Sequence, residues 1–384
     1  MQIVKLKDVV MRVKDKIDKD NTDLEYYIGG EHIDSGEICI TRKGKLEGST
    51  IGPAFHMHFM PGDVLLMSRN PHLKKAGVVD FEGICSDVSY ICRTKDESVL
   101  LQRYLPFIFQ TNHFWQFVEE NKKGGLPFFL NWSDFERYEF PLPNIEKQKE
   151  LSDLLWSALD TKLSYIELLK QTDELVKSQF IEMFDEYKNH KHKLKDICLK
   201  GPQNGFYRKG AELNGTIPIM KMKQLFGFES MSEADNYELV SLTEKELERF
   251  LLTDNDLLFG RRSLVVEGAG KCKRVGKLKD KAVFESSMLR VTLDPIKIRP
   301  RYLQIWFDLD EGKKTIESIR AVTTIAGIKG SDLANVFVPI APIELQDKFL
   351  SFVEQSDKSK FEIKNAIRKI DDMLVSIMKE IYNN

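Results

Sequence analysis

The sequence predicts an α+β chain built as an internal repeat, in which two similar α/β modules are separated by two long antiparallel helices. Three observations support this prediction: sequence recurs near an offset of 198 residues, each half begins with strand-like segments, and each half ends in a long segment without glycine. We expect the modules at residues 1–142 and 193–342, and the helices at 143–192 and 343–384. A duplicated chain of this kind has an approximate twofold axis, with the two helices packed as a coiled coil.

The recurrence is clearest in the second part of each half. Arg103-Tyr104-Leu105 returns as Arg301-Tyr302-Leu303, and Ser133-Asp134 returns as Ser331-Asp332. The register runs without a gap from 103–186 to 301–384, and 15 of these 84 positions are identical. Identity this low leaves chance similarity open for any single match, but the common order and register of the matches favour duplication.

The first part of each module is predicted to form strands. Val88–Cys92 and Ser287–Val291 are short runs rich in aliphatic, aromatic and β-branched residues, with turn-forming residues around them. Such runs are typical of strands. Asp63-Val64-Leu65-Leu66 resembles Asp256-Leu257-Leu258-Phe259 at a slightly different offset, which is expected where connecting loops differ in length.

The second part of each half is predicted to form one long helix. From Ile145 to Tyr187, and again from Ile343 onward, there is neither glycine nor proline. In the second helix apolar residues recur at alternating steps of four and three, which keeps one stripe facing a partner helix. This seam consists of Ile363, Ile367, Ile370, Leu374, Ile377 and Ile381, and the equivalent positions of the first helix are Tyr165, Leu169, Thr172, Val176, Gln179 and Met183.

The first helix is less apolar along this seam, and additional residues are expected to widen its buried face. These residues are Leu151, Leu154, Leu155, Leu159, Ile166, Phe180 and Phe184. A helix of roughly 40 residues is about 60 Å long, which exceeds a single globular core. We therefore expect the two helices to pack on each other and to hold the two modules apart.

Composition indicates a globular chain without a targeting or membrane segment. The 384 residues are 42% hydrophobic and 30% charged. No apolar run approaches the roughly 18 residues of a membrane span, and the first residues lack the pattern of a signal peptide. The five cysteines form no Cys-x-x-Cys pair, and an odd number of scattered cysteines fits a reducing compartment. We expect a soluble, cytoplasmic protein.

Charge is distributed unevenly along the chain. The net charge of −2 argues against indiscriminate binding to polyanions. Residues 1–142 carry 18 basic and 21 acidic residues, a net of −3, whereas residues 193–342 carry 25 and 20, a net of +5. Segment 261–281 concentrates the excess, with eight basic and two acidic residues. A solvated basic face and a contact surface for a polyanion both fit this segment.

Patterns that would indicate catalysis or metal binding are incomplete. Gly268-Ala269-Gly270-Lys271 lacks the first glycine and the final serine or threonine of a phosphate-binding loop. His56 and His58 alternate on a predicted strand without a third ligand nearby, so we interpret them as structural. Asn70-Pro71-His72 begins like the Asn-Pro-Pro-aromatic signature of amino-methyltransferases and departs from it at the third position. The sequence predicts no catalytic residue, no cofactor and no metal site in this chain.

One protein family combines two such modules with two long helices. The pattern Pro-x-x-x-Ile-Glu-x-Gln occurs at the start of each helix, at Pro141–Gln148 and at Pro339–Gln346, and Gly62–Arg69 has a counterpart in Asn255–Arg262. In these features the chain resembles, over essentially its whole length, the specificity subunits of type I restriction–modification enzymes. In both copies one residue separates the glutamate from the glutamine, whereas the family usually has an adjacent Glu-Gln pair. This difference makes the specificity for partner subunits harder to infer.

This resemblance implies a division of labour between subunits. The two modules would be target-recognition domains, each reading one half of a split double-stranded DNA sequence. The helices would serve as a spacer and as the docking surface for two DNA methyltransferase (modification) subunits, with restriction/translocase subunits completing the enzyme. S-adenosylmethionine, ATP and Mg²⁺ would then be bound by the partner subunits, in agreement with the missing catalytic patterns in this chain.

The candidate DNA contacts lie in loops of the two modules, several of them at matching positions. Arginine suits a bidentate contact to guanine and asparagine a contact to adenine, whereas contacts to phosphate only position the protein. The candidates of the first module are Arg42, Lys43, Lys45, Ser68, Arg69, Asn70, Lys74 and Lys75. Those of the second module are Arg261, Arg262, Ser263, Lys271, Lys273 and Arg274. Each residue alone is more typical of a solvated surface, but sets in matching loops favour contact with DNA.

Two other classes of function stay open on the sequence alone. The first is a non-catalytic coiled-coil scaffold with two protein-binding domains. A salt-dependent gel shift in the presence of the partner methyltransferase would separate a DNA reader from such a scaffold. The second is an enzyme with an unrecognised site, which any turnover by the purified chain would reveal.

Overall fold

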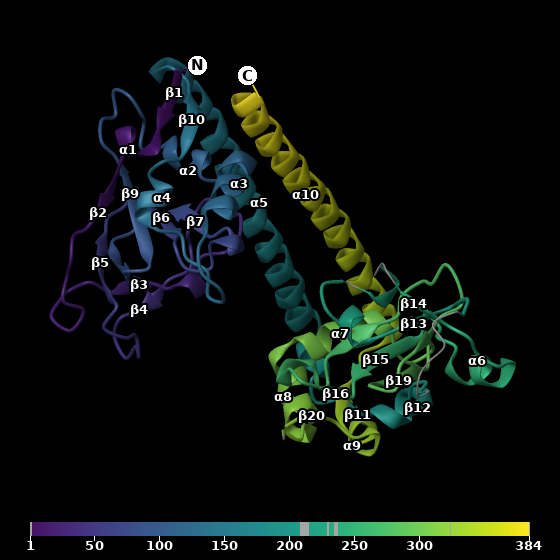
Figure 1. Cartoon of the computed structure of the whole chain (residues 1–384). Helices are drawn as coiled ribbons and strands as arrows, with labels where there is room; N and C mark the ends of the chain where they lie inside the picture. The colour runs from purple at the N-terminus through teal and green to yellow at the C-terminus, as the bar shows by residue number, and fades with distance from the viewer. Residues whose placement is uncertain (1, 208–214, 229, 234–236, 323, 384) are drawn as a thin grey trace. The chain divides into compact units, whose positions relative to one another are not determined.

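The computed structural model describes residues 2–207, 215–228, 230–233, 237–322 and 324–383, with the backbone alone for residues 233 and 380–383 (Figure 1). The chain divides into two units. Unit 1 comprises Met1–Ile166 and Lys364–Asn384, and unit 2 comprises Glu167–Ile363. Each unit therefore contains one of the two predicted modules and a part of both long helices. In the part of the chain that is described, no helix has the length and apolar character needed to cross a membrane.

The module of unit 1 contains three sheets. The first has the strand order β2-β9-β6-β7, and all of its neighbouring strands are antiparallel. The second has the order β4-β3-β8-β5 with β3 and β8 parallel, and the third pairs β1 with β10. The strands are β1 (Gln2–Lys5), β2 (Val10–Val13), β3 (Tyr26–Ile28), β4 (Gly44–Lys45), β5 (Phe55–Phe59), β6 (Val64–Met67), β7 (Ala76–Val78), β8 (Gly83–Ser86), β9 (Ser89–Thr94) and β10 (Glu139–Leu142).

The module of unit 2 repeats this plan. Its antiparallel sheet has the order β12-β19-β15-β17, its mixed sheet has the order β14-β13-β18 with β13 and β18 parallel, and β11 pairs with β21. The predicted strands Val88–Cys92 and Ser287–Val291 correspond to β9 and β19, which hold the same place in the two sheets. The predicted internal repeat is therefore confirmed. The strands are β11 (Lys191–Lys193), β12 (Cys198–Asn204), β13 (Ile217–Met220), β14 (Glu238–Val240), β15 (Asp256–Gly260), β16 (Arg262–Ser263), β17 (Cys272–Arg274), β18 (Val283–Phe284), β19 (Met288–Leu293), β20 (Ala326–Gly327) and β21 (Phe337–Pro339).

Short helices fill the connections, and α3 and α6 begin at a threonine whose side chain caps the helix N-terminus. The Thr111 Oγ1 accepts a hydrogen bond from the Phe114 N–H at 3.1 Å, and Thr243 with Glu246 forms a capping box. The α-helices are α1 (Leu6–Val9), α2 (Leu105–Ile108), α3 (Asn112–Asn121), α4 (Trp132–Phe135), α6 (Glu244–Phe250), α7 (Pro300–Asp308), α8 (Asp310–Ile319) and α9 (Gly330–Ala334). The 3₁₀ turns are η1 (Gly30–His32), η2 (Pro71–Leu73), η3 (Asp185–Tyr187), η4 (Leu194–Ile197), η5 (Met222–Leu225), η6 (Met231–Glu233) and η7 (Val266–Gly268).

The first long helix, α5 (Ile145–Phe184), is fixed to its module by a buried glutamine in its first turn. The Oε1 of Gln148 accepts a hydrogen bond from the Leu101 N–H at 3.0 Å. Its Nε2 donates to the Pro143 carbonyl at 2.8 Å and to the Val99 carbonyl at 2.9 Å. The side chain is fully buried. A buried amide is stable only when its polar atoms have partners, so this residue type is required at the helix start.

The second long helix, α10 (Ile343–Asn383), repeats the same contacts. The Oε1 of Gln346 accepts from the Arg299 N–H at 2.9 Å. Its Nε2 donates to the carbonyl of Ala341 at 2.8 Å and to that of Lys297 at 3.1 Å. All three partners stand 198 residues after those of the first helix. The glutamine of the repeated motif is thus an anchor between module and helix.

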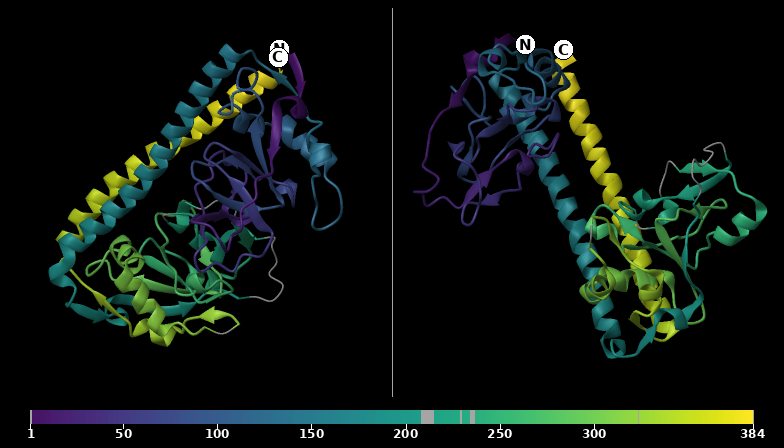
Figure 2. Two further views of the ribbon diagram at one scale, coloured as in Figure 1. Left: turned by 90° about the vertical axis from the view of Figure 1, so that its left-hand side faces the viewer. Right: turned by 60° about the horizontal axis from the view of Figure 1, so that its bottom comes forward.

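The two long helices run side by side within each unit (Figure 2). In unit 1 the Nζ of Lys162 lies 2.7 Å from the Oδ1 of Asp371. In unit 2 the Nζ of Lys360 lies 3.0 Å from the Oδ1 of Asp173. The two lysines are equivalent in the repeat, and so are the two aspartates. Each ion pair therefore joins a lysine of one copy to the aspartate of the other.

The predicted seam lies on the inner side of both helices. The seam positions from Ile363 to Ile377 and from Tyr165 to Met183 are all buried or half-buried, and the side chain of Ile381 is outside the described residues. In unit 2, Phe180 contacts Phe349 while Asp173 contacts Lys360, so a later position in α5 meets an earlier position in α10. This confirms the antiparallel arrangement.

Two residues expected on the buried face of α5 are exposed. Leu154 lies at the edge of the stripe and is 47% exposed, and Ile166 lies beyond the part of α5 that packs on the module and is 45% exposed. The other five predicted residues are buried. They belong to the module cores, which also contain Leu374 in unit 1 and Phe349 in unit 2. The modules and the helices therefore share their cores.

The long helices of the structure have the following bounds beside the predicted segments 143–192 and 343–384. α5 begins two residues after position 143 and ends at Phe184, eight residues before position 192. The second module begins with β11 at Lys191, two residues before position 193. α10 begins at Ile343, where the second helix was predicted to start.

Candidate nucleic-acid interface

The loop that follows β6 is held against a second loop, which the sequence had not indicated. Arg69 forms a β-bridge with Phe129, and the Asn70 N–H donates to the Phe128 carbonyl at 2.8 Å. The Leu130 N–H donates to the Ser68 carbonyl at 2.9 Å. Segments 68–75 and 123–129 therefore form one surface, which we call paired loop 1.

Unit 2 has the same construction after β15. Arg262 in β16 pairs with Gly327 in β20, at the positions equivalent to Arg69 and Phe129. The Ile328 N–H donates to the Arg261 carbonyl at 3.0 Å, which repeats the Leu130–Ser68 hydrogen bond of unit 1. Segments 261–263 and 321–327, described apart from residue 323, form paired loop 2. The two modules thus present equivalent backbone platforms.

A buried aspartate fixes the turn that leads into β6 and into β15, the strands that precede the two paired loops. The Oδ2 of Asp63 accepts the Met60 N–H at 2.8 Å, and the Oδ2 of Asp256 accepts the Thr253 N–H at 2.7 Å. Asp63 is balanced by Arg93, whose Nε and Nη2 donate to its two oxygens at 2.7 and 2.8 Å. Burial raises the pKa of Asp256, while the hydrogen bonds it accepts oppose this shift. These carboxylates set the strand positions and face away from solvent.

Arg69, Asn70 and Lys74 lie in paired loop 1. Arg69 and Lys74 are exposed. Asn70 and Lys74 both have a φ of 51°, a left-handed conformation in which asparagine is more frequent than most residues. The Oδ1 of Asn70 is buried without a hydrogen-bond partner in the described part of the chain. Arg69 and Lys74 are therefore the side chains of this set that are free to extend from the loop.

Ser68 and Lys75 are bound to the protein instead. Ser68 is buried, and its hydroxyl donates to the Val88 carbonyl at 2.6 Å. The Nζ of Lys75 donates to the Gly30 carbonyl. Ser68 ends the buried part of the strand, so its side chain faces inward, and we remove it from the candidate DNA contacts as a correction. Lys75 is half-buried and supports the loop through this hydrogen bond.

Arg42, Lys43 and Lys45 lie in and next to β4, outside paired loop 1. Arg42 forms an ion pair with Asp34. The Nζ of Lys43 lies 3.7 Å from the centroid of the Tyr26 ring, a cation–π contact that holds the ammonium at the surface. All three residues are exposed. Their position in a different sheet from β6 makes them a separate basic patch of the first module.

Arg261, Arg262 and Ser263 make up the first segment of paired loop 2, in which Arg262 and Ser263 form β16. Arg262 is exposed, whereas Arg261 is half-buried and its Nη1 donates to the Ser286 carbonyl at 3.3 Å. The Ser263 hydroxyl accepts the Val265 N–H at 3.1 Å, which shapes the following turn. Of the three, Arg262 is the side chain directed to solvent.

Lys271, Lys273 and Arg274 lie in and next to β17, which pairs with β15. The Gly260 N–H donates to the Lys271 carbonyl at 3.0 Å, so Lys271 is brought next to paired loop 2, with its Nζ 4.9 Å from the Phe226 ring centroid. Lys273 pairs with Leu258, further from the loop. All three are half-buried.

Sequence reasoning did not find the apolar tips of the paired loops. Leu126 is 88% exposed, and Leu264 directly after β16 is 84% exposed. In the same first loop the Nζ of Lys122 lies 4.4 Å from the Phe128 ring centroid, and Lys123 forms an ion pair with Asp134. The turn residues Gly124-Gly125 and Pro127 indicate a loop, but only the β-bridge to Arg69 shows that it belongs to the same surface. Exposed apolar side chains can contact thymine methyl groups or enter between base pairs.

The cysteines and potential metal ligands offer no reactive centre in the described residues. Burial raises the pKa of all five cysteine thiols. The pKa rises to about 12 for Cys85 and Cys198, and it is also raised for Cys39, Cys92 and Cys272. These thiols are therefore protonated near neutral pH. Among the residues whose placement is described, no three His, Cys, Asp or Glu side chains are grouped as metal ligands.

The geometry defines a class of chain: a tandem pair of similar α+β modules, each with a paired-loop surface and each anchored to two antiparallel helices. Residues 187–370 match the family described as the type I restriction modification DNA specificity domain. The match covers 184 of the 384 residues, and the predicted resemblance to type I specificity subunits is confirmed.

Two relatives are specificity subunits of type I restriction enzymes. The EcoKI specificity subunit of Escherichia coli strain K12 is 22% identical over 279 residues, which cover 65% of this chain and 58% of that protein. The MjaIX specificity subunit of Methanocaldococcus jannaschii is 23% identical over 372 residues, which cover 88% of this chain and 78% of that protein. The match thus spans little more than half the length of the first relative.

Two solved structures share the fold over nearly the whole chain. One belongs to a study of complex assembly and conformational transition of the type I R-M system, with a TM-score of 0.56 and 15% identity over 99% of this chain and 97% of that chain. The other is the S subunit of a type I restriction-modification system from M. genitalium, with a TM-score of 0.53 and 12% identity over 99% and 96% of the two chains. These matches confirm the predicted architecture.

Proposed function

We propose that this chain is the DNA-reading subunit of a type I restriction–modification enzyme. Each module reads one half of a bipartite double-stranded DNA target, and the chain directs methyltransferase and restriction subunits to that target. The chain itself is non-catalytic and works in the cytoplasm. S-adenosylmethionine, ATP and Mg²⁺ are bound by the partner subunits.

The observation that carries this proposal is the recurrence of one backbone platform whose second segments have different side chains. Both paired loops follow the equivalent strand and are closed by equivalent hydrogen bonds. Yet no residue of 123–132 is identical to its counterpart in 321–330. Reading two different half-sequences requires that different side chains reach base edges from a similar position. A scaffold that binds the same protein at both modules has no need for this difference.

The exposed arginines Arg69 and Arg262 are the leading base or phosphate contacts of the two modules. They occupy equivalent positions, so each variant is the matched control for the other. We expect Arg69→Ala to relax recognition of one half-site and Arg262→Ala to relax recognition of the other, because the bidentate contact of an arginine to guanine contributes about 1–3 kcal/mol of discrimination.

Methylation profiling of a genome in cells that carry the chain, either variant or no chain tests the proposal. Loss of a bipartite methylation pattern when the chain is removed is the expected result. If both arginine variants relax the same half-site, or both half-sites equally, the arginines position the protein and do not read the sequence. A methylation pattern that is independent of the chain would refute the function and leave the protein-binding scaffold.

The charge of the chain sets a second expectation. A net charge of −2 and the small size of the basic patches give weak binding of the isolated chain to DNA at physiological salt. The complex with methyltransferase subunits should bind more tightly and with a steeper salt dependence, because the partner adds phosphate contacts. Strong specific binding by the chain alone would contradict this expectation.

A further inference from the structure

Directly after β16 in the second module, three consecutive aliphatic residues are exposed to solvent. The exposed fractions are 84% for Leu264, 58% for Val265 and 39% for Val266. Burial of aliphatic side chains is favourable, so a continuous run of them at the surface indicates a surface that is covered when a ligand binds. We call residues 264–266 the aliphatic segment.

The aliphatic segment is held firmly on paired loop 2. The Gly268 N–H donates a hydrogen bond to the Val265 carbonyl at 3.0 Å. The Arg320 Nε donates to the Ala269 carbonyl at 2.9 Å, and Arg320 directly precedes the second half of the paired loop. Val322 in that half is also exposed, at 63%. A surface that is already ordered loses little conformational entropy when it binds a ligand.

Positive charge accompanies the aliphatic segment. Arg262 lies two residues before Leu264 and is exposed. Lys271 lies beside the same loop, with its Nζ 4.9 Å from the centroid of the partly exposed Phe226 ring. Segment 261–281 as a whole has eight basic and two acidic residues. Aliphatic and basic side chains together suit a polyanion that also presents apolar groups, and DNA is such a polyanion.

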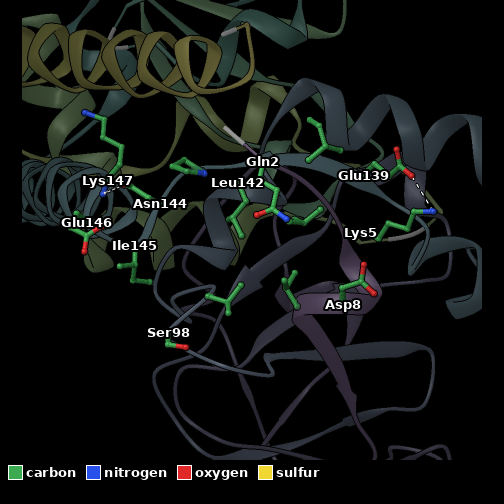
Figure 3. A pocket seen from close by; sticks show the side chains of 15 residues that line it. Gln2, Lys5, Asp8, Ser98, Glu139, Leu142, Asn144, Ile145, Glu146 and Lys147 are labelled. Atoms are coloured by element: carbon green, nitrogen blue, oxygen red, sulfur yellow. Dashed lines mark hydrogen bonds and ion pairs between the residues drawn. The ribbon is translucent and has the colours of Figure 1, made fainter.

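A surface hollow of about 1000 Å³ at the start of α5 in unit 1 shows a different combination (Figure 3). It also contains an exposed aliphatic residue, Ile3. The charged residues that line it are three acidic and two basic, namely Asp8, Glu139, Glu146, Lys5 and Lys147. This balance does not attract a polyanion. The basic surroundings of the aliphatic segment therefore distinguish it from other exposed apolar residues as a contact for DNA.

The chemistry of base pairs determines what an aliphatic side chain can read. Among the groups that base pairs present in the major groove, the 5-methyl group of thymine is the apolar one, and the others are hydrogen-bond donors and acceptors. Pro71 and His72 stand at the positions of paired loop 1 equivalent to Leu264 and Val265, and Pro71 is buried. The two modules therefore present different chemistry directly after equivalent backbone positions.

We propose that the aliphatic segment reads thymine. Leu264 and Val265 contact thymine 5-methyl groups in the half-site of the second module, beside the base or phosphate that Arg262 contacts. The half-sequence read by this module therefore contains thymine. The proposal rests on the proposed function, in which paired loop 2 faces DNA, and it adds the kind of base that this loop selects.

The test uses the complete complex with its methyltransferase subunits and a duplex oligonucleotide that carries the target found by methylation profiling. Each thymine of the target is replaced in turn by deoxyuridine, which lacks the 5-methyl group and keeps every hydrogen-bonding group of thymine. At a contacted thymine the dissociation constant, measured at constant salt, should rise about fourfold, the effect of removing one buried methyl group. The thymines that Leu264 and Val265 contact should lie in one half-site.

Variants of the aliphatic segment identify which residues contact these thymines. Leu264→Ala or Val265→Ala should weaken binding to the thymine duplex by a similar factor and remove most of the sensitivity to deoxyuridine, because both changes disrupt one contact. Leu199→Ala is the matched control, since Leu199 is 62% exposed in the same module. It follows Cys198, which pairs with Leu293 at the opposite end of the sheet from Gly260, where paired loop 2 begins. This variant should keep the full sensitivity.

Several results would overturn the thymine contact. One is equal weakening of the thymine and deoxyuridine duplexes by Leu264→Ala, which would indicate insertion between base pairs or a structural role. Others are full deoxyuridine sensitivity in both variants, and a half-site without thymine. Loss of a methyltransferase subunit from the variants, with an unchanged deoxyuridine effect, would assign the segment to a protein contact. A complex that binds no sequence specifically refutes the proposed function itself, whereas specific binding without any effect of deoxyuridine refutes the thymine contact alone.

Discussion

Replacing Gln346 with alanine should remove the anchor of the second long helix. The fully buried side chain accepts the Arg299 N–H and donates to the carbonyls of Ala341 and Lys297. Each buried polar group that loses its hydrogen-bond partner costs about 1–3 kcal/mol of stability. Three backbone groups lose their partner here, and water that enters the vacated space offsets a part of the total cost. We expect the free energy of unfolding to fall by about 2–4 kcal/mol, a large share of the roughly 5–15 kcal/mol of a typical domain. Gln148→Ala should have the same effect in unit 1.

Urea unfolding combined with hydrogen exchange measured by mass spectrometry would resolve the two units. Gln346→Ala should accelerate exchange at the start of α10 and around Arg299, and leave the start of α5 unchanged. Gln355→Ala is the matched control, because it removes an exposed glutamine from the same helix and should change stability by less than about 0.5 kcal/mol. A change of less than about 1 kcal/mol for Gln346→Ala, or equal changes for the two variants, would refute the anchoring role.

Three further perturbations follow from other contacts. A double-mutant cycle on Lys162 and Asp371, measured by urea unfolding, should give a coupling free energy of about 0.2–1 kcal/mol. The coupling should decline at high salt because both side chains are partly exposed. A coupling that persists in about 1 M salt would contradict a screened ion pair. Arg299 donates hydrogen bonds to both carboxylate oxygens of Asp347 and holds the pKa of Asp347 below its usual range. The ionised carboxylate therefore stabilises the fold at pH values above about 3.9, the pKa of an aspartate in the unfolded chain. This contribution disappears as the pH falls through the lowered pKa of the folded state. The stability difference between the unaltered chain and Asp347→Asn should therefore vanish in acid, and a difference that grows in acid would be inconsistent with this assignment. Inserting four residues within 157–176 adds about 6 Å of helix. Methylation profiling should then show an unread gap between the half-sequences that is longer by about two base pairs, or no methylation because the complex does not assemble. Altered half-sequences with an unaltered gap would show that the helices are not the spacer.

The repeat and the helices could be predicted from the sequence because they depend on order and spacing. Backbone register is set by patterns of apolar and turn residues, and these survive in both copies even though 15 of 84 positions are identical. Two of those identities carried more information than the pattern showed. Lys162 is identical to its counterpart Lys360, and Asp173 to Asp371. The ion pairs Lys162–Asp371 and Lys360–Asp173 join these residues across the antiparallel helices.

The accessibility of individual side chains could not be predicted in the same way. Ser68 and Arg69 are neighbours in one predicted turn, yet the end of a strand directs the first inward and the second outward. Lys75 is turned to a carbonyl that lies 45 residues earlier in the sequence. Leu126 became a candidate only through the bridge between Arg69 and Phe129. These properties depend on tertiary contacts between distant segments, which no local pattern contains.

The distribution of repeated and unrepeated residues connects the structure with the function. Gln148 and Gln346 make the same three contacts, and Asp63 and Asp256 fix the same turn, so positions that hold the backbone are kept in both halves. The second segments of the loops that these positions support, 123–132 and 321–330, share no residue between the halves. A rigid platform places its side chains reproducibly, and precise placement is what discrimination between bases requires. Because backbone hydrogen bonds and buried residues fix the platform, the exposed loop side chains can differ between the two modules without changing the fold. Under the proposed function, one architecture therefore suffices to read two unrelated half-sequences.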